Sequence, residues 1–253
     1  MLEIDSVDTY YGSSQILHGT SLSVGEGEVV GLLGRNGMGK STLVHTVAGL
    51  LKPRRGQVTF RGRRISSLAA ERISRLGMSL VPQGHRIFPS LTVRENFRIA
   101  SRRVGDRDWT ADEVLEYFPA LRERWSVPAG KLSGGQQQML AMGRAMVCNG
   151  KLMLLDEPTE GLDPQTVGRM GEAIDELRRR GTSALLVEQK VGFTLERVDR
   201  ALILSRGQVI YETDRPQLLR ADTQTLRRLI GVSSAHEADG SRAIADENES
   251  PVG

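Results

Sequence analysis

Short apolar runs recur along the chain, separated by longer stretches in which apolar residues return at helical spacing. Such runs are typical of parallel strands that are buried on both faces. They predict strands at Val29–Leu33, Met78–Val81, Leu152–Leu155, Ala184–Val187 and Ala201–Leu204. Two further strands are expected near the N-terminus, at Leu2–Val7 and Ile16–Val24. We therefore predict an α/β fold with a mainly parallel sheet, to which the N-terminal strands add an antiparallel part.

The clearest helical pattern covers Pro164–Arg180, where apolar residues recur every three or four positions. Asp163 is suited to cap its first turn, and Gly181 is placed to end it. A shorter helix is expected at Lys40–Ala48, ending at Gly49. Helices that alternate with strands in this way would cover the predicted sheet.

The segment from about residue 84 to residue 131 departs from this alternation. It contains two helical patterns, Thr92–Arg103 and Thr110–Trp125, and no convincing strand. We interpret it as a helical subdomain inserted into one domain that covers residues 1–231. After that domain the apolar residues thin out, so we expect residues 232–253 to form a disordered tail.

Composition narrows the class of protein. The 253 residues include one cysteine, which excludes an internal disulfide framework and fits a reducing compartment. We expect no secretory signal at the start, and no apolar run approaches the roughly 20 residues that a membrane-spanning helix needs. The formal net charge is +3, and the basic clusters contain no interleaved aromatic residues. We therefore expect no nucleic-acid partner.

A glycine-rich segment lies between the predicted strand Val29–Leu33 and the predicted helix that begins at Lys40. It fits the pattern G-x-x-x-x-G-K-[ST], which marks a P-loop when it follows a strand and opens a helix. In such a loop the backbone N–H groups converge on phosphate oxygens, the lysine reaches the β- and γ-phosphates, and the serine hydroxyl binds Mg²⁺. We predict a P-loop NTPase core whose nucleoside triphosphate site is built by Gly34, Arg35, Asn36, Gly37, Met38, Gly39, Lys40, Ser41 and Thr42.

Two carboxylates follow the predicted strand Leu152–Leu155. Ligands of open α/β sheets bind at the carboxyl ends of the strands. Asp156 is placed to hold Mg²⁺, and Glu157 is placed to orient or deprotonate the attacking water. An acidic pair after a strand is often a helix cap instead, but the neighbouring P-loop favours the catalytic interpretation.

A second glycine-containing turn reads Leu132-Ser133-Gly134-Gly135-Gln136 and precedes a predicted helix. It presents another helix N-terminus with free N–H groups, which is a second anion site. The methionines of that helix, at positions 139, 142 and 146, share one face, and we expect them to lie in the core.

The turn resembles LSGGQ, the signature of the ATP-binding cassette (ABC) family, and the P-loop and the LMLLDEP residues occur with it in the family's order. The resemblance covers about residues 1–231 and implies that ATP and Mg²⁺ are bound between two such domains. Ser133, Gly134, Gly135 and Gln136 of one domain would then face the P-loop of the other.

Other positions match minor elements of the same family. Tyr11 matches the aromatic residue that stacks on adenine, and the adjacent Tyr10 competes for this role. Gln83 resembles the glutamine that binds Mg²⁺ and senses the γ-phosphate, and it leads into the helical subdomain, which in the family contacts the membrane subunits. Gly161-Leu162-Asp163 resembles the loop that crosses the dimer interface.

One position departs from the family. The usual histidine after the strand that follows this loop's helix is replaced by Gln189, within Val187-Glu188-Gln189-Lys190. An amide can still hydrogen-bond a γ-phosphate oxygen, but it cannot titrate or carry charge. The glutamine and the stretches around it resemble ATPase subunits of branched-chain amino-acid importers, and urea and short-amide importers have near-identical subunits. Those subunits commonly show VEQN, GGEQQ and EGLAP, from which Lys190, Gln136 and Asp163 differ.

The resemblance implies an ATPase subunit that energises an importer. It would attach peripherally to membrane permease subunits on the cytoplasmic side of the plasma membrane, pair with a second ABC ATPase subunit, and serve a substrate-binding protein indirectly. The alternatives are a soluble ABC ATPase without a transport role, such as one that assists iron–sulfur assembly, and a non-catalytic nucleotide-binding regulator. Glu157 disfavours the regulator, because such a protein does not need the residue placed to activate water.

Overall fold

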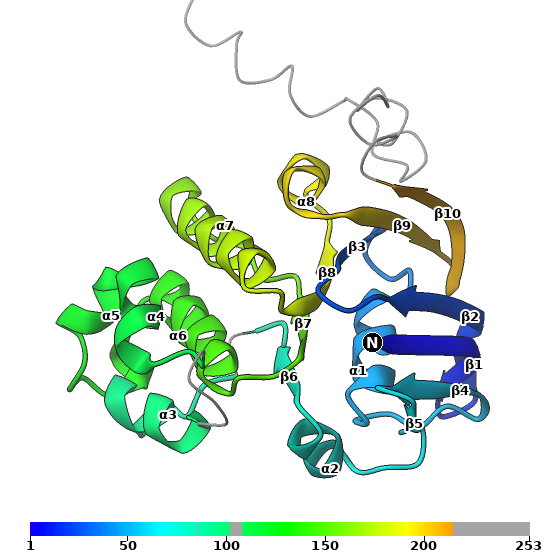
Figure 1. Ribbon diagram of the computed structural model, residues 1–253, viewed down its shortest axis with the longest axis horizontal. Coiled ribbons are helices and arrows are strands. Elements are labelled where there is room, and N and C mark those ends of the chain that lie inside the picture. Colours follow the sequence, from blue (N-terminus) through cyan, green and yellow to red (C-terminus); the bar gives the residue numbers. More distant parts are fainter. Residues whose placement is uncertain (85, 102–107, 215–253) are drawn as a thin grey trace, which may run out of the picture.

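A six-stranded sheet runs through the centre of the molecule (Figure 1). The computed structural model describes residues 1–84, 86–101 and 108–214. The strands lie in the order β10, β9, β3, β8, β7 and β6, with the bounds Gln208–Asp214, Arg200–Ser205, Val29–Leu33, Ser183–Glu188, Leu152–Asp156 and Met78–Val81. All neighbours pair in parallel except β10, which is antiparallel to β9. The predicted mainly parallel sheet is confirmed.

The register of this sheet brings the carboxyl ends of its central strands to one edge. Leu33 of β3 lies opposite Glu188 of β8, and Asp156 of β7 lies opposite Val187. The residues that follow these strands are therefore neighbours in space, although they are far apart in the sequence. All residues of β3, β7 and β8 are buried, as the apolar runs predicted.

A second, antiparallel sheet covers one face of the first and lies on the right of Figure 1. Its order is β2, β1, β4 and β5, with the bounds Ser14–Val24, Leu2–Tyr11, Arg55–Phe60 and Arg63–Arg64. The expected antiparallel addition is confirmed, but β1 continues beyond Val7 to Tyr11. Strands β4 and β5 carry no buried apolar run, and the hydrophobic pattern did not predict them.

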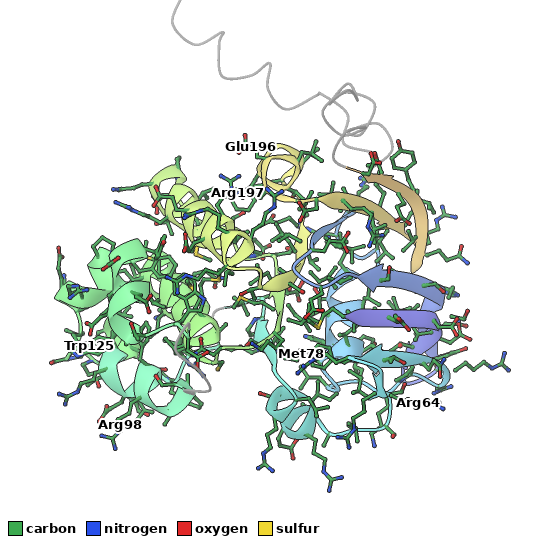
Figure 2. All side chains as sticks on the ribbon, viewed as in Figure 1. Arg64, Met78, Arg98, Trp125, Glu196 and Arg197 are labelled. Carbon is green, nitrogen blue, oxygen red and sulfur yellow. The ribbon has the colours of Figure 1, made fainter. Side chains whose placement is uncertain are left out.

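In the described part of the chain, four helices connect or flank these sheets: α1 (Lys40–Val47), α2 (Ala70–Arg75), α7 (Pro164–Arg179) and α8 (Val191–Arg197). The predicted ends of α7 are confirmed, because Asp163 Oδ1 accepts a hydrogen bond from Thr166 N at 3.0 Å and Gly181 has φ +74°. Arg197 lies on α8 beside α7 (Figure 2), and a Cβ on Gly171 of α7 would lie 2.6 Å from Arg197 Nη2.

The remaining helices gather on the left of Figure 1. They are α3 (Val93–Ala100), α4 (Ala111–Tyr117), α5 (Pro119–Glu123), the 3₁₀ turn η1 (Ala129–Lys131) and α6 (Gly134–Val147). Helices α3, α4 and α5 all pack against α6, so this helical layer continues past residue 131. Met139, Met142 and Met146 of α6 are buried, as expected.

The single helix expected at Thr110–Trp125 is wrong. Two helices, α4 and α5, occupy this segment, and the chain between them leaves helical geometry at Phe118 (φ −123°, ψ 62°). The cause is Pro119, which cannot donate a backbone hydrogen bond and disfavours helical geometry in the residue before it. The helix expected at Thr92–Arg103 is shorter than predicted, since Ser101 is its C-cap, and residues 102 and 103 lie outside the described part.

Buried side chains form two groups, one on each face of the central sheet. Val30 and Leu32 of β3 pack with α1 and the antiparallel sheet, whereas Val29 and Leu33 pack toward the helical layer and α7. Within residues 1–84, 86–101 and 108–214, no helix has the length and apolar content to span a membrane. The tail expected at residues 232–253 lies outside the described residues.

Candidate functional site

The P-loop connects β3 to α1 through three glycines whose positions require the absence of a side chain. Gly37 and Gly39 have φ +79° and +100°, which few other residues adopt. A Cβ on Gly34 would lie 2.5 Å from the carbonyl oxygen of Leu204. Gly39 is the N-cap of α1, and no side chain that the structure describes caps this helix. The first N–H groups of α1 are therefore available to an anion.

Lys40 lies at the start of α1 and 4% of it is exposed. Its Nζ donates hydrogen bonds to the carbonyl oxygens of Gly34 at 2.8 Å and Arg35 at 3.1 Å. The same nitrogen lies 3.1 Å from Oε1 of Glu157, which follows β7. Lysine and glutamate, separated by more than a hundred positions in the sequence, thus form a buried ion pair beside the P-loop.

Asp156 ends β7 and is fully buried beside Ser41. Ser41 Oγ donates to Asp156 Oδ1 at 3.1 Å, whereas Oδ2 is buried and has no hydrogen-bond partner among the described residues. Burial raises the pKa of Asp156 to about 6, against the lowering effect of the hydrogen bond from Ser41. Hydroxyl and carboxylate oxygens are the ligands that Mg²⁺ prefers, and the unpartnered Oδ2 fits a cation. These residues therefore suit the metal that the sequence predicts.

Glu157 is held from several sides, and 5% of it is exposed. Its backbone has φ +50°, and its N–H donates to the carbonyl oxygen of Val187 at 2.9 Å. Oε2 accepts a hydrogen bond from Gln189 Nε2 at 3.0 Å and a longer one from Gln83 Nε2 at 3.4 Å. Gln83 also donates to Glu160 Oε2 at 2.7 Å. The structure thus brings together residues predicted from four separate motifs.

A cavity of about 360 Å³ opens over the P-loop. It is lined by Ile16 of β2, by Gln83 after β6, by Glu157 after β7, and by residues of the P-loop and α1: Asn36, Gly37, Gly39, Lys40, Ser41 and Thr42. Ile16 and Glu160 were missed by the sequence reasoning. Glu160 had a signal, a third acid close to the pair Asp156 and Glu157, whereas Ile16 was indistinguishable from a core residue.

The two tyrosines at the end of β1 differ in their surroundings. Tyr11 is 48% exposed, and its hydroxyl approaches His45 Nδ1 at 3.5 Å. Tyr10 donates its hydroxyl to Gln15 Oε1 at 2.7 Å, and the guanidinium of Arg54 covers its ring at 4.2 Å. Tyr11, the predicted adenine residue, therefore offers the more accessible ring, although it does not line the cavity over the P-loop.

The signature turn lies at the N-terminus of α6. Ser133 caps the helix by accepting a hydrogen bond from Gln136 N at 3.3 Å, and Gln136 Oε1 accepts one from Ser133 N at 3.1 Å. Ser133 and Gly134 are exposed, and no residue from 133 to 136 lines the cavity that the described residues form over the P-loop. A Cβ on Gly135 would lie 3.3 Å from Thr166 Oγ1, so the turn abuts the start of α7.

Comparison with known proteins identifies the family. The sequence profile described as "ABC transporter" matches residues 17–160. The chain is 43% identical to the high-affinity branched-chain amino acid transport ATP-binding protein BraG of Pseudomonas aeruginosa, over 83% of this chain and 91% of that protein. It is 34% identical to the lipopolysaccharide export system ATP-binding protein LptB of Haemophilus influenzae, over 91% of this chain and 97% of that one.

Solved structures agree in fold. A nucleotide-free ATP-binding cassette from an ABC transporter superposes with a TM-score of 0.78 at 27% identity, covering 91% of this chain and 99% of that one. A dimeric cassette bound to ADP and phosphate, in a post-hydrolysis state, superposes with a TM-score of 0.75 at 26% identity, covering 85% and 99%. The chain therefore belongs to the ATP-binding subunits of ABC transporters, and it is an ATPase.

Proposed function

We propose that Lys40 and the P-loop amides bind the phosphates of ATP, and that Glu157 takes the proton from the water that attacks the γ-phosphate. The observation that carries this proposal is the carboxylate of Glu157, buried at the cavity wall between Lys40 Nζ and Gln189 Nε2. A general base must lie within hydrogen-bond reach of its water, and this carboxylate lines the same cavity as the P-loop.

Ser41, Asp156 and Gln83 would hold Mg²⁺. The Oγ of Ser41 and the unpartnered Oδ2 of Asp156 support this role, with the amide oxygen of Gln83 as a third donor. When bound, Mg²⁺ neutralises charge on the β- and γ-phosphates. Asp156 with a pKa of about 6 is mostly ionised at pH 7, and a nearby cation would favour that form further.

Gln189 would orient the reacting groups without exchanging a proton. Its Nε2 donates to Glu157 Oε2 at 3.0 Å, and a neutral amide stays a donor throughout the physiological pH range. A histidine at this position would gain or lose a proton near pH 6.5. The pH dependence of ATP hydrolysis in this chain should therefore show no contribution from residue 189.

The variant Glu157→Gln tests the base. It keeps the size of the side chain and removes the group that accepts a proton, so we expect ATP to bind while turnover falls by at least about 10². Steady-state phosphate release and nucleotide binding would be measured together. Glu123→Gln, in the helical layer, is the control. Near-normal turnover in Glu157→Gln would contradict the role of Glu157.

A second ABC ATPase subunit, identical or different, would complete each ATP site. The exposure of Ser133 and Gly134 and their separation from the P-loop cavity support a role in a partner's site. The free N–H groups at the start of α6 suit phosphate oxygens. The similarity to a dimeric cassette bound to ADP and phosphate supports the same arrangement.

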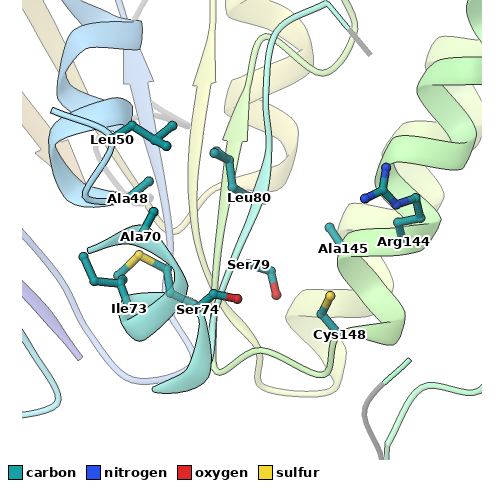
Figure 3. Close-up of a pocket in the computed structure, with 11 residues that line it drawn as sticks. Ala48, Leu50, Ala70, Ile73, Ser74, Ser79, Leu80, Arg144, Ala145 and Cys148 are labelled. Atoms are coloured by element: carbon teal, nitrogen blue, oxygen red, sulfur yellow. The ribbon is translucent and has the colours of Figure 1, made fainter. Parts of the chain in front are cut away.

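Permease subunits would dock at a groove between α2 and the end of α1 on one side and α6 on the other. The groove is a cavity of about 240 Å³ (Figure 3), and its lining comes from the end of α1, from α2, from β6 and from α6: Ala48, Leu50, Ala70, Ile73, Ser74, Met78, Ser79, Leu80, Arg144, Ala145 and Cys148. Leu50 is 48% exposed. Phe88 is 46% exposed and stacks beneath the guanidinium of Arg144 at 4.5 Å. A helix with an apolar face fits such a surface.

The groove is connected to the nucleotide site through α1. Lys40 begins this helix at the P-loop, and Ala48 and Leu50 at its other end line the groove. If bound nucleotide displaced α1, the groove would move with it, and the displacement would be transmitted to a docked permease. We expect Leu50→Glu to keep basal ATPase activity and to lose cosedimentation with permease-containing vesicles. Ile210→Glu on β10, where the parent side chain is 53% exposed, is the matched control. Equal cosedimentation of both variants would contradict docking at this groove.

The transported substrate would be a branched-chain or other hydrophobic amino acid, delivered by a substrate-binding protein. The 43% identity to BraG over most of both chains supports this class. The subunit would lie peripherally on the cytoplasmic side of the plasma membrane. Uptake of labelled leucine by cells that contain the permeases and this ATPase tests the proposal. Leucine uptake that is insensitive to Glu157→Gln, with urea uptake that depends on it, would favour a urea or amide importer.

A further inference from the structure

A buried pair of residues, Thr159 and Glu188, lies close in sequence to Glu157 and Gln189. Neither residue takes part in the proposed binding of phosphate or metal or in the activation of water. Thr159 is fully buried, and 2% of Glu188 is exposed. Glu188 Oε1 accepts hydrogen bonds from the backbone N–H of Thr159 at 3.0 Å and from its hydroxyl at 2.6 Å. A carboxylate that is removed from water needs such donors, so these two residues are held firmly together.

The same carboxylate also holds the turn that follows β8. Its Oε2 accepts a hydrogen bond from the backbone N–H of Gln189 at 3.1 Å and a longer one from that of Lys190 at 3.5 Å. Lys190 Nζ donates in turn to the carbonyl oxygen of Thr159 at 3.0 Å. Thr159 is thus bound through its N–H, its hydroxyl and its carbonyl by the two residues that flank Gln189. We name Thr159, Glu188 and Lys190 the latch.

The latch joins the two segments that carry Glu157 and Gln189. Glu157 precedes Thr159 by two positions, and Gln189 lies between the other latch residues. The contact between Gln189 Nε2 and Glu157 Oε2 measures 3.0 Å, so a shift of either segment by a fraction of an ångström would weaken it. Glu157 has φ +50°, and a non-glycine residue keeps that conformation only when its surroundings hold it there.

We propose that the latch positions Gln189 against Glu157 and thereby sets the rate of ATP hydrolysis. This inference rests on the proposed function, in which Glu157 is the base. Thr159, Glu188 and Lys190 are positioning residues, since none of them lines the cavity over the P-loop. An interaction that acts on the chemical step alone changes kcat and leaves the binding of ATP unaltered.

Thr159 offers a matched pair of variants. Thr159→Val removes the hydroxyl and preserves the shape, whereas Thr159→Ser keeps the hydroxyl and loses a methyl group. We expect Thr159→Val to lower kcat by at least about tenfold, as for loss of a hydrogen bond to a charged group. KM for ATP should stay within about twofold, and Thr159→Ser should retain kcat within about threefold, since its hydroxyl preserves that hydrogen bond.

The decisive measurement repeats the pair in a Gln189→Ala background. If the latch acts through Gln189, Thr159→Val should change kcat there by no more than about twofold, because the contact that it positions is already gone. Equal losses in both backgrounds, or equal kcat for the Val and Ser variants, would overturn the proposal. Should Thr159→Val fail to fold by circular dichroism, Lys190→Met, at an exposed position, is measured in both backgrounds with the same criterion.

Glu157→Gln separates this inference from the proposed function. Normal turnover in Glu157→Gln would contradict the base and, with it, the basis of the latch. Lost turnover in Glu157→Gln together with unchanged kcat in Thr159→Val would contradict the latch alone.

Discussion

Lys40 Nζ lies 3.1 Å from Oε1 of Glu157, and both side chains are almost fully buried. Glu157 would be costly to bury without this partner. The γ-phosphate of ATP carries the same sign of charge as Glu157 and would compete for the same ammonium group. In the proposed mechanism, bound nucleotide would therefore draw Lys40 away from Glu157 and leave the carboxylate free to accept a proton from water.

Lys40→Ala should lose most of the affinity for ATP. The substitution removes the positive charge that is proposed to contact the β- and γ-phosphates, and a charge-assisted contact of this kind contributes at least about 1.4 kcal/mol, or tenfold in Kd. Binding of a fluorescent ATP analogue gives the measurement, with Lys52→Ala after α1 as the control. An affinity within about threefold of the parent would contradict the assignment of the P-loop.

Gln189→Ala should lower turnover by about one to two decades while ATP binding changes little, since it removes one hydrogen bond to a charged group. Gln189→His should stay active and add a pH dependence near 6.5, because imidazole titrates there. Steady-state ATPase from pH 5.5 to 8.5, with Gln165→Ala as the control, tests both. A Gln189→Ala variant that matches the parent over that range would show that Glu157 works without help from position 189.

Asp156 should make the metal-free protein less stable as the pH rises. Its pKa is raised to about 6 in the folded protein, against about 3.9 in an unfolded chain. The folded state therefore binds more protons between these values, and the free energy of unfolding falls as the pH rises through this window.

Asp156→Asn, which replaces the carboxyl by an amide, should remove this loss of stability at high pH. In EDTA, Asp156→Asn should be more stable than the parent at pH 7.5 by up to about 3 kcal/mol, and the two should converge near pH 4. Urea unfolding at both pH values measures the difference, and Asp112→Asn at the surface is the control. With Mg²⁺ and ATP added, the parent should gain more stability than the variant. A difference that is the same at both pH values would contradict the raised pKa.

Tyr11→Ala should weaken ATP binding by roughly twofold to tenfold, as for loss of one aromatic stacking contact. Tyr10→Ala is the matched control, because the Tyr10 ring is already covered by Arg54 and its hydroxyl by Gln15. Titration with ATP and with a triphosphate that lacks a base separates stacking from phosphate binding. A larger effect from Tyr10→Ala would transfer the adenine role to that residue.

Local sequence patterns determined a large part of this fold. The strands Val29–Leu33 and Met78–Val81 have the predicted bounds, because a strand buried on both faces needs an unbroken run of residues that tolerate burial. The ends of α7 were equally predictable, since Asp163 caps its first turn and Gly181 ends its last turn through local contacts alone. The P-loop was predictable for the same reason: its glycines are required by the conformation of the loop itself.

Tertiary structure decided what depends on segments far apart in the sequence. Strand β4 forms because it pairs with β1, and β5 because it pairs with β4, while the residues of both strands carry little hydrophobic signal. The preference for Tyr11 over Tyr10 follows from Arg54 and Gln15, which only folding brings near. Glu188 follows an apolar run at the end of its strand, and no local pattern indicates that its carboxylate accepts a hydrogen bond from Thr159. Such contacts depend on how the strands align with one another across the whole sheet. The hydrophobic pattern along one strand does not specify this alignment.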